Sequence, residues 1–534
     1  MTGWMEHLVV APIVVPMVAG AAIILAGDRR RRLTAAIGLM STVLLVVLAA
    51  ILLGLADSPT VHVYRLGNWP TLFGIVLVLD RLSAVMLALA ALLGLAAFLF
   101  SLGRWQRAGV YFQPLFQFQL MGLNGAFLTG DLFNLFVFFE VMLAASYGMA
   151  LHGSGVARVR AGLHYIVVNL VASLLFLVGV SVVYGVAGTL NMAELAHRMR
   201  EVAAEDRGLL ETGLAVLGIA FLVKAAMWPL GFWLPPTYAA ATTPAAAILS
   251  ILSKVGIYAV LRVWLLLFGG TAGPSAGFGE AWLLVGGLLT IAFGSIAMLA
   301  TQNLPRLAGA SVMISSGTLL AAIGAGQVTV TGGALLYLVS SVLSIGAFFL
   351  LIELVERGRE VGADVLAVSR EAFGAGEDEE EMDEQDTVGV AIPGTIAVLG
   401  FAFMACAVLL AGLPPLSGFL AKFAILSTLL ASSGPSVSPT TWALMAALIL
   451  SGFATVVAML RSGIDVFWTS PAARAPRIGL IEIVPVAMLL LLCAVLTVGA
   501  GPASAYLQSA AEGLHLPASY LQGVIAAPGE SAGP

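Results

Sequence analysis

Apolar runs long enough to cross a lipid bilayer recur along the whole chain, and no other feature constrains its fold as strongly. A helix of eighteen or more apolar residues spans a hydrocarbon layer about 30 Å thick. Hydrophobic residues make up 60% of the 534 residues, charged residues only 10%, and the mean hydropathy is +1.03. This composition excludes a soluble domain. The sequence therefore predicts an all-α polytopic membrane protein. It has about fourteen transmembrane helices, centred near residues 17, 44, 90, 120, 140, 175, 221, 255, 290, 314, 342, 410, 450 and 490.

Arginine is distributed unevenly between alternate loops, which predicts the orientation of the chain. The side with few arginines carries mainly Arg65, Arg198, Arg200 and Arg207. Under the positive-inside rule, the richer side faces the cytoplasm, so both termini are predicted to lie outside. The first apolar run is read as a retained span, because its positive cluster DRRRR follows the run instead of preceding it. The richer side carries Arg29 to Arg32, Arg104, Arg107, Arg158, Arg160, Arg306, Arg357, Arg359, Arg461, Arg474 and Arg477.

Two segments are predicted to lie outside the membrane. Residues 191–208, NMAELAHRMREVAAEDRG, have apolar residues at helical spacing and predict an amphipathic surface helix. Residues 356–388 form a cytoplasmic loop that becomes strongly acidic, which indicates either a solvated segment or a docking surface for a partner. The acidic net charge of −5 does not suggest a nucleic-acid partner. Cys406 and Cys493 lie in apolar segments and predict neither a disulfide nor a metal site.

Two apolar spans are interrupted by residues that break helices. The segment KAAMWPLGFWLPPTYAAATTP contains Pro229, Pro235 and Pro236, and the segment AGLPPLSGFLAK contains Pro414 and Pro415. Backbone groups freed at such breaks need protein or water partners, so broken membrane helices tend to line cavities. The two breaks lie about five spans apart, as equivalent members of two internal repeats would.

Four ionisable residues lie well inside apolar spans: Glu140, Lys224, Lys254 and Lys422. Each charge at a helix centre costs about 2.5–3.5 kcal/mol on insertion scales, so these side chains must face the interior and be paired or hydrated. A static ion pair that fixes helix packing is one interpretation. Three lysines share one glutamate, however, and two of the lysines belong to the broken spans. Lysine and glutamate both move toward their neutral forms in a dry interior. The pattern therefore favours a proton path.

Other polar residues are weaker candidates. Asp131 follows Thr129 and Gly130, and is read as a helix N-cap or as the entrance to a proton path. His164 is read as an interfacial histidine or as an accessory relay member. Asp80 and Arg81 begin the third span and mark its interface. The sequence shows no catalytic nucleophile arrangement, phosphate-binding loop or metal-ligand cluster, so neither an enzyme site nor a cofactor is predicted.

Three long segments in the same order carry a family resemblance. They are GAFLTGDLFNLFVFFEVMLAASYG, VKAAMWPLGFWLPPTYAAATTPAAAILSILSKVGIYAVLR and LLAGLPPLSGFLAKF. The chain resembles the D-type subunit of Mrp-type multisubunit sodium/proton antiporters, which is related to the antiporter-like subunits of respiratory complex I. By this resemblance, Glu140, Lys224, Lys254 and Lys422 match the family's proposed proton-translocation residues on helices five, seven, eight and twelve.

The chain departs from the family pattern in two places. Many relatives carry a histidine or lysine in the eleventh helix, where this chain reads LLYLVSSVLSIGAFFLL. Ser340, Ser341 and Ser344 stand there, so hydroxyls and water are expected to replace the ionisable group, with Ser341 and Ser344 as accessory candidates. Gly231 occupies a position where some relatives place a bulkier or polar residue.

The resemblance also implies the organisation and the role of the chain. Two inverted five-helix repeats, helices 4–8 and 9–13, each contain one broken helix. They divide the chain into residues 1–110, 111–270, 271–462 with the acidic loop, and 463–534 with a last helix.

The implied function is a proton-translocating subunit of a monovalent cation (sodium)/proton antiporter in the bacterial cytoplasmic (inner) membrane, with partner subunits of the A, B, C, E, F and G types. It is expected to have no catalytic site and no cofactor of its own. A proton-pumping subunit of a redox-driven complex, of the complex I or membrane hydrogenase type, is the first alternative. A scaffold whose buried charges only pack helices is the second.

Overall fold

The computed structural model describes residues 6–525, apart from residues 59, 70, 72–73, 106–110, 154, 271, 358–393, 433–436 and 469–477. The acidic loop predicted at residues 356–388 therefore lies almost entirely outside the described residues. Arg107, Arg359, Arg474 and Arg477, which entered the orientation argument, also lie outside them.

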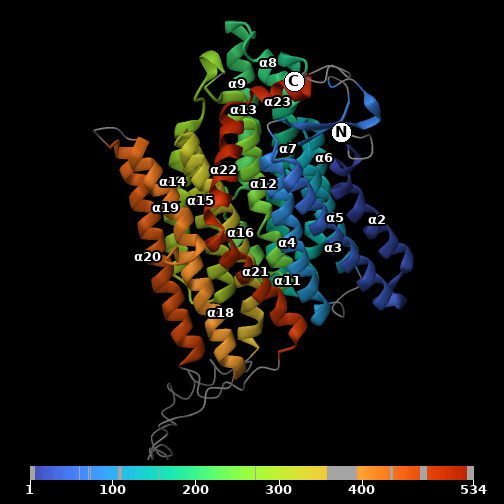
Figure 1. The fold of residues 1–534 in the computed structure, drawn as a ribbon, viewed down its shortest axis with the longest axis vertical. Helices are drawn as coiled ribbons and strands as arrows, with labels where there is room; N and C mark the ends of the chain where they lie inside the picture. Colours follow the sequence, from blue (N-terminus) through green and yellow to red (C-terminus); the bar gives the residue numbers. More distant parts are fainter. Residues whose placement is uncertain are drawn as a thin grey trace, which may run out of the picture.

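Long helices that run from one end of the molecule to the other dominate the described chain (Figure 1). Eleven segments of the described residues are long and apolar enough to cross a membrane. They are α3 (Arg31–Leu55), α4 (Arg81–Gly103), α6 (Leu132–Ala150), α7 (Val156–Ala187), the segment Thr243–Phe268, Gly273–Leu299 with α14 (Glu280–Leu299), α15 (Leu304–Gly324), α16 (Val328–Glu356), α18 (Gly394–Ala411), α20 (Pro439–Phe467) and α21 (Leu480–Val498). The predicted polytopic helical membrane fold is confirmed, whereas the number fourteen and the two repeats stay predictions.

Shorter helices complete the fold. The segment Thr243–Phe268 is built from α11 (Thr243–Leu249), α12 (Leu252–Ala259), a π-helical turn at Val260–Trp264 and α13 (Leu265–Phe268). The remaining helices are α2 (Ala11–Ala26), α5 (Phe112–Leu128), α8 (Met192–Arg198), α9 (Ala204–Lys224), α10 (Leu234–Ala240), α19 (Ser417–Ser432), α22 (Ala500–His515) and α23 (Ala518–Ile525).

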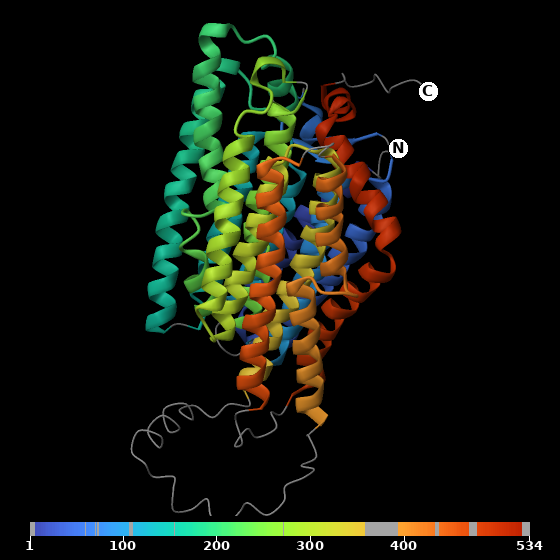
Figure 2. The same ribbon diagram turned by 90° about the vertical axis from the view of Figure 1, so that its left-hand side faces the viewer.

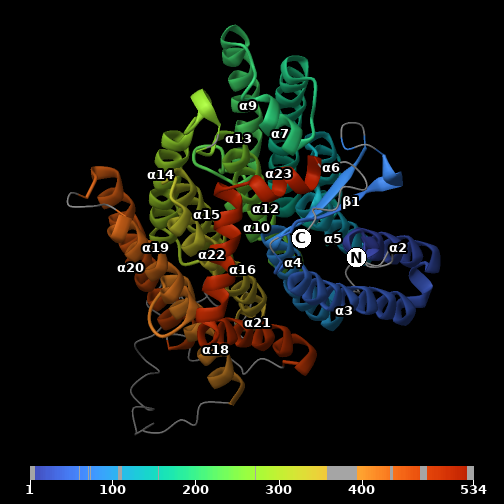
Figure 3. The same cartoon turned by 45° about the horizontal axis from the view of Figure 1, so that its top comes forward.

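Helix α16 forms the axis of the molecule. It packs against α4, α11, α15, α18, α19, α21 and α22, and almost all of its side chains are buried. Helices α2 and α3 lie on one side of this axis and α19 and α20 on the other (Figures 1 and 3). Helices α7 and α9 stand together at one edge in the view turned by 90° (Figure 2). Helices α8 and α23 lie at one end of the bundle, and α18 begins at the opposite end.

A short β-hairpin is the one sheet among the described residues, and the sequence analysis did not predict it. Strand β1 (His62–Arg65) pairs antiparallel with β2 (Val76–Leu79), whose four side chains are all buried. The Val76 carbonyl also accepts a hydrogen bond of 2.9 Å from the Gly130 backbone N–H, which fixes the start of α6. The hairpin lies at the same end of the molecule as α23 (Figure 3).

The predicted surface helix at residues 191–208 is only partly correct. Helix α8 ends at Arg198, and α9 begins at Ala204 after a turn. The Asn191 side chain caps α8 by accepting hydrogen bonds from the backbone N–H groups of Ala193 and Glu194. Glu205 and Asp206 in the first turn of α9 favour a second start there, because acidic side chains stabilise helix N-termini. The apolar spacing runs across the turn, so the pattern alone suggested one helix.

The two broken spans are interrupted close to the predicted positions. Pro229 lies between α9 and α10, and Pro414 and Pro415 lie between α18 and α19. Pro235 and Pro236, in contrast, occupy the first turn of α10 and begin a helix instead of breaking one. Proline is tolerated there because the first helical N–H groups have no partner within the helix.

Candidate functional site

A line of polar side chains crosses the interior from α6 through α9, α12, α15 and α16 to α19. Lys224, Lys254 and Lys422 are 4%, 1% and 6% exposed, and Glu140 is half-buried. Glu140 lies in the middle of α6 and Lys254 near the middle of the segment Thr243–Phe268. Lys224 and Lys422 lie beside the two helix breaks. The structure therefore places the three lysines of the prediction inside the bundle.

These three residues are the only lysines in the sequence. The other 21 of the 24 lysine and arginine residues are arginines. Arginine keeps its proton under all physiological conditions, whereas the amine of lysine can release one when it is buried. The chain thus confines its side-chain amines to the membrane interior. This division is visible in the sequence, and counting the lysines would have revealed it.

Lys224 is the last residue of α9 and forms no ion pair within 4.0 Å among the described residues, although the charge of Glu140 acts on it from farther away. Its Nζ lies 5.0 Å from the ring centroid of Phe139 and makes no hydrogen bond within the described part of the chain. The carboxylate of Glu140 instead accepts a hydrogen bond from the Ser173 hydroxyl on α7. Among the described residues, Glu140 forms no ion pair within 4.0 Å. A static pair between Glu140 and Lys224, one interpretation of the sequence, is absent from this conformation.

The break after Lys224 is a tight fold of the backbone. Ala226 has a positive φ of 58°, and a Cβ added at Gly231 would lie 2.2 Å from the Ala226 carbonyl oxygen. The Trp233 indole donates a hydrogen bond of 3.2 Å to the Val223 carbonyl, which also accepts one of 3.1 Å from the Ala226 backbone N–H. Gly231 therefore allows a close backbone approach here, which accounts for the absence of a larger side chain.

Lys254 lies where α12 crosses the end of α9. A Cβ added at Gly256 would lie 2.4 Å from the backbone nitrogen of Ala225, so the two helices touch through their backbones beside Lys224. The Lys254 Nζ donates a hydrogen bond of 3.2 Å to the Ser316 hydroxyl on α15. Its partner is thus a neutral group.

Serine hydroxyls continue the line from α15 to α19. Ser315 donates to Ser341 over 2.9 Å, and Ser340 and Ser417 share a hydrogen bond of 2.9 Å. A pocket of about 10 Å³ between these helices, just enough for the centre of one water molecule, is lined by polar residues and some apolar ones. We call Ser315, Ser316, Ser340, Ser341, Ser344 and Ser417 the serine bridge. The sequence analysis named Ser340, Ser341 and Ser344 but missed Ser315, Ser316 and Ser417, although ISSG and PLSG are polar interruptions of apolar spans. The polar residues around the pocket are Ser311, Tyr337, Ser340, Ser341, Ser344 and Thr455.

Lys422 closes the line at the second break. Its Nζ donates a hydrogen bond of 2.9 Å to the carbonyl of Ala411, the last residue of α18. Gly412 has a φ of +76°, and a Cβ there would lie 2.6 Å from Lys422 Cδ. The break therefore supplies both the acceptor for this lysine and the space that its side chain occupies.

Two accessory candidates lie away from this line. Asp131 caps α6 by accepting a hydrogen bond of 2.9 Å from the Asn134 backbone N–H, and burial raises the pKa of its carboxyl group. His164 is exposed on α7, so the structure does not bring it into the interior. Among the described residues, no group of three His, Cys, Asp or Glu side chains is arranged to hold a metal ion.

Amines, hydroxyls and one carboxylate can each bind and release protons, and here they lie in the interior of a bundle of membrane-spanning helices. Fold and site together define a polytopic membrane protein whose interior carries several proton-binding groups between α6 and α19.

Comparison with known proteins identifies the family. The family described as NADH:quinone oxidoreductase/Mrp antiporter, TM, matches residues 129–453, a range that includes Glu140 and all three lysines. The chain belongs to this family, and the resemblance inferred from the sequence is confirmed.

Three relatives illustrate the match. The D-type subunit of a probable K(+)/H(+) antiporter of Rhizobium meliloti is 56% identical over 537 residues, which cover 99% of each chain. The D-type subunit of a Na(+)/H(+) antiporter of Alkalihalophilus pseudofirmus is 31% identical over 529 residues, which cover 98% of this chain and 100% of the relative. A chain in the structure of the Mrp complex from Dietzia sp. DQ12-45-1b superposes with a TM-score of 0.80 at 25% identity, over 98% of this chain and 100% of that one.

Proposed function

We propose that this chain is the proton-translocating membrane subunit of a multisubunit monovalent cation/proton antiporter in a bacterial cytoplasmic membrane. Protons pass along Glu140, Lys224, Lys254, the serine bridge and Lys422. One observation carries the proposal: lysine occurs only at three buried positions, and each amine faces a neutral group. A carboxylate partner would hold a proton on the amine, whereas an aromatic ring, a hydroxyl or a carbonyl leaves it exchangeable.

The geometry suggests how charge moves along the line. Glu140 follows Phe139 directly, so a small shift of α6 brings its carboxylate toward or away from Lys224. Approach of the negative charge stabilises the proton on Lys224, and withdrawal releases it toward Lys254. Between Lys254 and Lys422 the hydroxyls of the serine bridge and a water molecule both donate and accept hydrogen bonds, so they conduct a proton without an ionisable residue.

The surroundings of Glu140 support an assembly with further subunits. Phe133 and Val137, two turns and one turn before Glu140 on α6, are 52% and 40% exposed. A half-buried carboxylate at mid-membrane depth is costly against lipid, so we expect a helix of a neighbouring subunit to cover this face. The two curated relatives named above match over nearly their whole length and are named as antiporter subunits, which favours the antiporter over the redox-driven pump within the same family. Partner subunits of the A, B, C, E, F and G types are part of the proposal.

Potassium is the first cation to test, and sodium the second. The relative at 56% identity is named for K(+)/H(+) exchange, and the one at 31% identity for Na(+)/H(+) exchange. The complete complex would be expressed in a strain that lacks its own antiporters, and exchange measured in everted vesicles as the cation-dependent collapse of a pH gradient. Lys224→Ala and Lys224→Arg are both expected to lower the exchange rate at least tenfold, because arginine keeps the charge but does not release its proton.

Arg198→Lys, a change on the surface helix α8, serves as the matched control and should leave exchange within twofold. Purification of the complex shows whether each variant assembles. Full exchange by an assembled Lys224→Ala complex would overturn the proposal and leave the scaffold interpretation.

A further inference from the structure

A second buried charged group lies at the end of the bundle that carries the β-hairpin. Arg262, in the π-helical turn Val260–Trp264, is 4% exposed and donates two hydrogen bonds to the Asp80 carboxylate, of 2.6 and 2.7 Å. Asp80 also caps α4 by accepting a hydrogen bond of 2.9 Å from the Ser83 backbone N–H. Among the described arginines, Arg262 is the one that is fully buried. Since its guanidinium cannot lose its proton, it brings a fixed positive charge to Asp80.

Asp80 lines a small polar pocket. The pocket has a volume of about 40 Å³ for water-sized molecules, enough for several waters. Tyr520, on α23, is 4% exposed, and its hydroxyl has no hydrogen-bond partner within the described residues. A buried hydroxyl of this kind calls for an ordered water. The polar residues around the pocket are Ser58, Thr60, Asp80, Arg81, Ser509, Ser519 and Tyr520.

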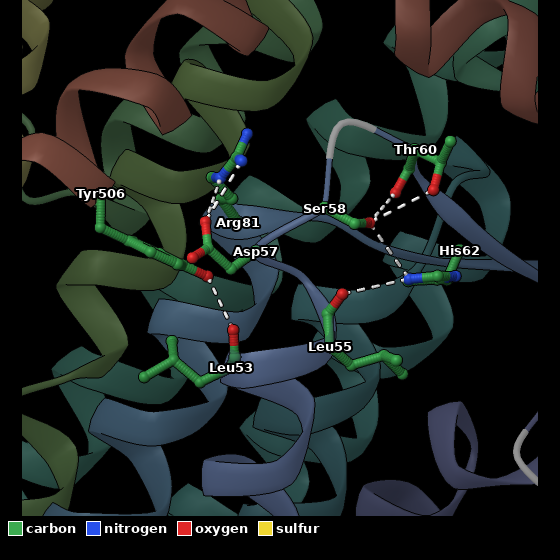
Figure 4. A network of polar contacts seen from close by, with 8 residues as sticks. All are labelled: Leu53, Leu55, Asp57, Ser58, Thr60, His62, Arg81 and Tyr506. Atoms are coloured by element: carbon green, nitrogen blue, oxygen red, sulfur yellow. Dashed lines mark hydrogen bonds and ion pairs between the residues drawn. The ribbon is translucent and has the colours of Figure 1, made fainter.

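The pocket is continuous with a polar network at the surface. Arg81 forms an ion pair of 3.2 Å with Asp57, whose side chain is 60% exposed. Beside it the Ser58 hydroxyl bonds to the Thr60 carbonyl and lies within hydrogen-bonding distance of His62 (Figure 4). Charged and hydroxyl groups therefore lead from solvent to Asp80.

Toward the interior, one helix face leads from Arg262, the partner of Asp80, to Lys254. Lys254, Tyr258 and Arg262 follow one another at intervals of four residues, so they project from the same side of α12 and the turn after it. The Tyr258 hydroxyl donates to the Phe127 carbonyl over 2.6 Å and lies 3.5 Å from an Arg262 nitrogen. The π-helical turn that carries Arg262 is a kind of irregularity found frequently at functional sites.

We propose that Asp80 is the group through which protons exchange between this water pocket and Lys254, with Arg262 as its gate. The inference rests on the proposed function. It adds a site where the proposed proton path meets water. While Arg262 is bonded, Asp80 stays an anion. When Arg262 moves away, a hydronium ion in the pocket transfers its proton to a carboxylate oxygen and is left as water. The return of Arg262 then drives that proton through intervening water to the lone pair of the neutral Lys254 amine. The arginine distribution predicts that this end of the molecule is external.

The charges around Asp80 agree with such a gate. Burial alone would raise the pKa of Asp80, but the charge and hydrogen bonds of Arg262, with those of Ser83, hold it below its ordinary value. Without Arg262, the buried carboxyl group would favour its protonated form. The other titratable or charged groups near Asp80 are Asp57, Arg81, Asp131, Tyr258, Tyr506 and Tyr520.

The test compares Asp80→Asn, Arg262→Gln and the double variant, all in the complete complex in vesicles. Asp80→Asn is expected to lower exchange at least tenfold at normal assembly, and the double variant should stay equally inactive because no group remains to carry the proton. A purely structural ion pair predicts the reverse, since neutralising both partners leaves neither charge unpaired and restores activity. Asp206→Asn, an exposed aspartate in the first turn of α9, is the matched control.

A second measurement reports on the pocket itself. Ser519→Cys places a thiol at the pocket, while the native Cys406 and Cys493 are buried. A membrane-impermeant maleimide is expected to label this thiol from the side that carries the termini and to lower exchange severalfold by closing the pocket. The inference would be overturned if the thiol is not labelled or if labelling leaves exchange unchanged. It would also be overturned if exchange recovers in the Asp80→Asn, Arg262→Gln double variant. If Lys224→Ala is inactive but Asp80→Asn is fully active, the role proposed for Asp80 is overturned and the proposed function stands. If Lys224→Ala is active, the proposed function is overturned as well.

Discussion

At the scale of single residues, the division between lysine and arginine explains what the interior can do. Lysine occurs only in the spans, and the one deeply buried arginine of the described chain is paired with Asp80. An amine that faces neutral groups can change its protonation state, whereas a paired guanidinium cannot. Lysine thus provides the groups that can exchange protons, and the buried arginine provides a fixed positive charge.

The serine bridge gives the first residue-scale prediction. Ser341→Ala removes the oxygen that accepts from Ser315 and contributes to the pocket between α15, α16 and α19. A hydrogen bond contributes about 1 kcal/mol, so exchange should fall about fivefold while the complex still assembles. Ser451→Ala is the control, because Ser451 is equally buried but bonds only to its own helix, at the Leu448 carbonyl. Equal exchange rates of the two variants would show that the bridge is not needed.

Most of the lysine line could be predicted from the sequence, but the Asp80–Arg262 pair could not. A charge in the middle of an apolar run stands out because its burial is costly, which singled out Glu140 and the lysines. Arg262 and Asp80 each lie near the end of a span, where an interfacial position explains a charged residue equally well. Their contact joins residues 182 positions apart, and a single sequence holds no signal for such a pairing.

At the scale of the elements, the two helix breaks hold lysines in different ways. The second break offers Lys422 the Ala411 carbonyl, while the first leaves Lys224 over an aromatic ring. The hydrogen bond of Lys422 thus joins α19 to the end of α18, whereas Lys224 forms no such bond between α9 and α10.

Gly412→Ala tests the geometry of the second break. A side chain at a φ of +76° is strained by about 1–2 kcal/mol, and its Cβ would collide with Lys422 Cδ at 2.6 Å. The variant is expected to lower both the thermal stability of the complex and its exchange rate, because Lys422 must leave the Ala411 carbonyl. Gly185→Ala on α7, where an added Cβ meets nothing within 4 Å, is the control and should change neither quantity. Wild-type behaviour of Gly412→Ala would contradict the role assigned to this break.

The sequence predicted these breaks because proline and glycine act locally, through their own backbone angles. The β-hairpin and the end of α8 were missed for the opposite reason. Strands of four residues are too short to give a clear alternating pattern, and β2 is uniformly apolar, like the start of a membrane span. The turn after α8 interrupts an apolar spacing that continues beyond it, so only the Asn191 cap and the acidic start of α9 mark two helices.

At the scale of the whole molecule, the line of proton-binding groups depends on α16 staying in register with its neighbours. It contributes the middle of the serine bridge, and its last turn is tied to two other helices at the end opposite the β-hairpin. Arg357, directly after α16, bonds to Glu353 on α16 and to Glu482 on α21, over 2.5 and 2.8 Å. The Trp105 indole, which follows α4, donates to the same Glu353 over 2.9 Å. We call Arg357, Glu353, Glu482 and Trp105 the inner clamp.

The inner clamp should affect stability without taking part in exchange. Burial disfavours a charged Arg357, but its hydrogen bonds to Glu482 and Glu353 raise its pKa above the ordinary value, so the clamp holds throughout neutral pH. Arg357→Gln removes the cation to which two carboxylates bond. Removal of one partner costs about 3–5 kcal/mol in a fully buried pair, and less here because Arg357 and Glu353 are partly exposed. We expect the purified complex to unfold at a clearly lower temperature, while vesicles assayed well below that temperature keep their exchange rate.

Arg306→Gln, at an exposed position in the first turn of α15, is the control and should change the stability by no more than about 0.5 kcal/mol. The two arginines belong to the same predicted face of the membrane, so the comparison separates the clamp from a general effect of positive charge there. Equal unfolding temperatures would show that α16 is held by packing alone. Loss of exchange in an Arg357→Gln complex of normal stability would instead bring the clamp into the proton path.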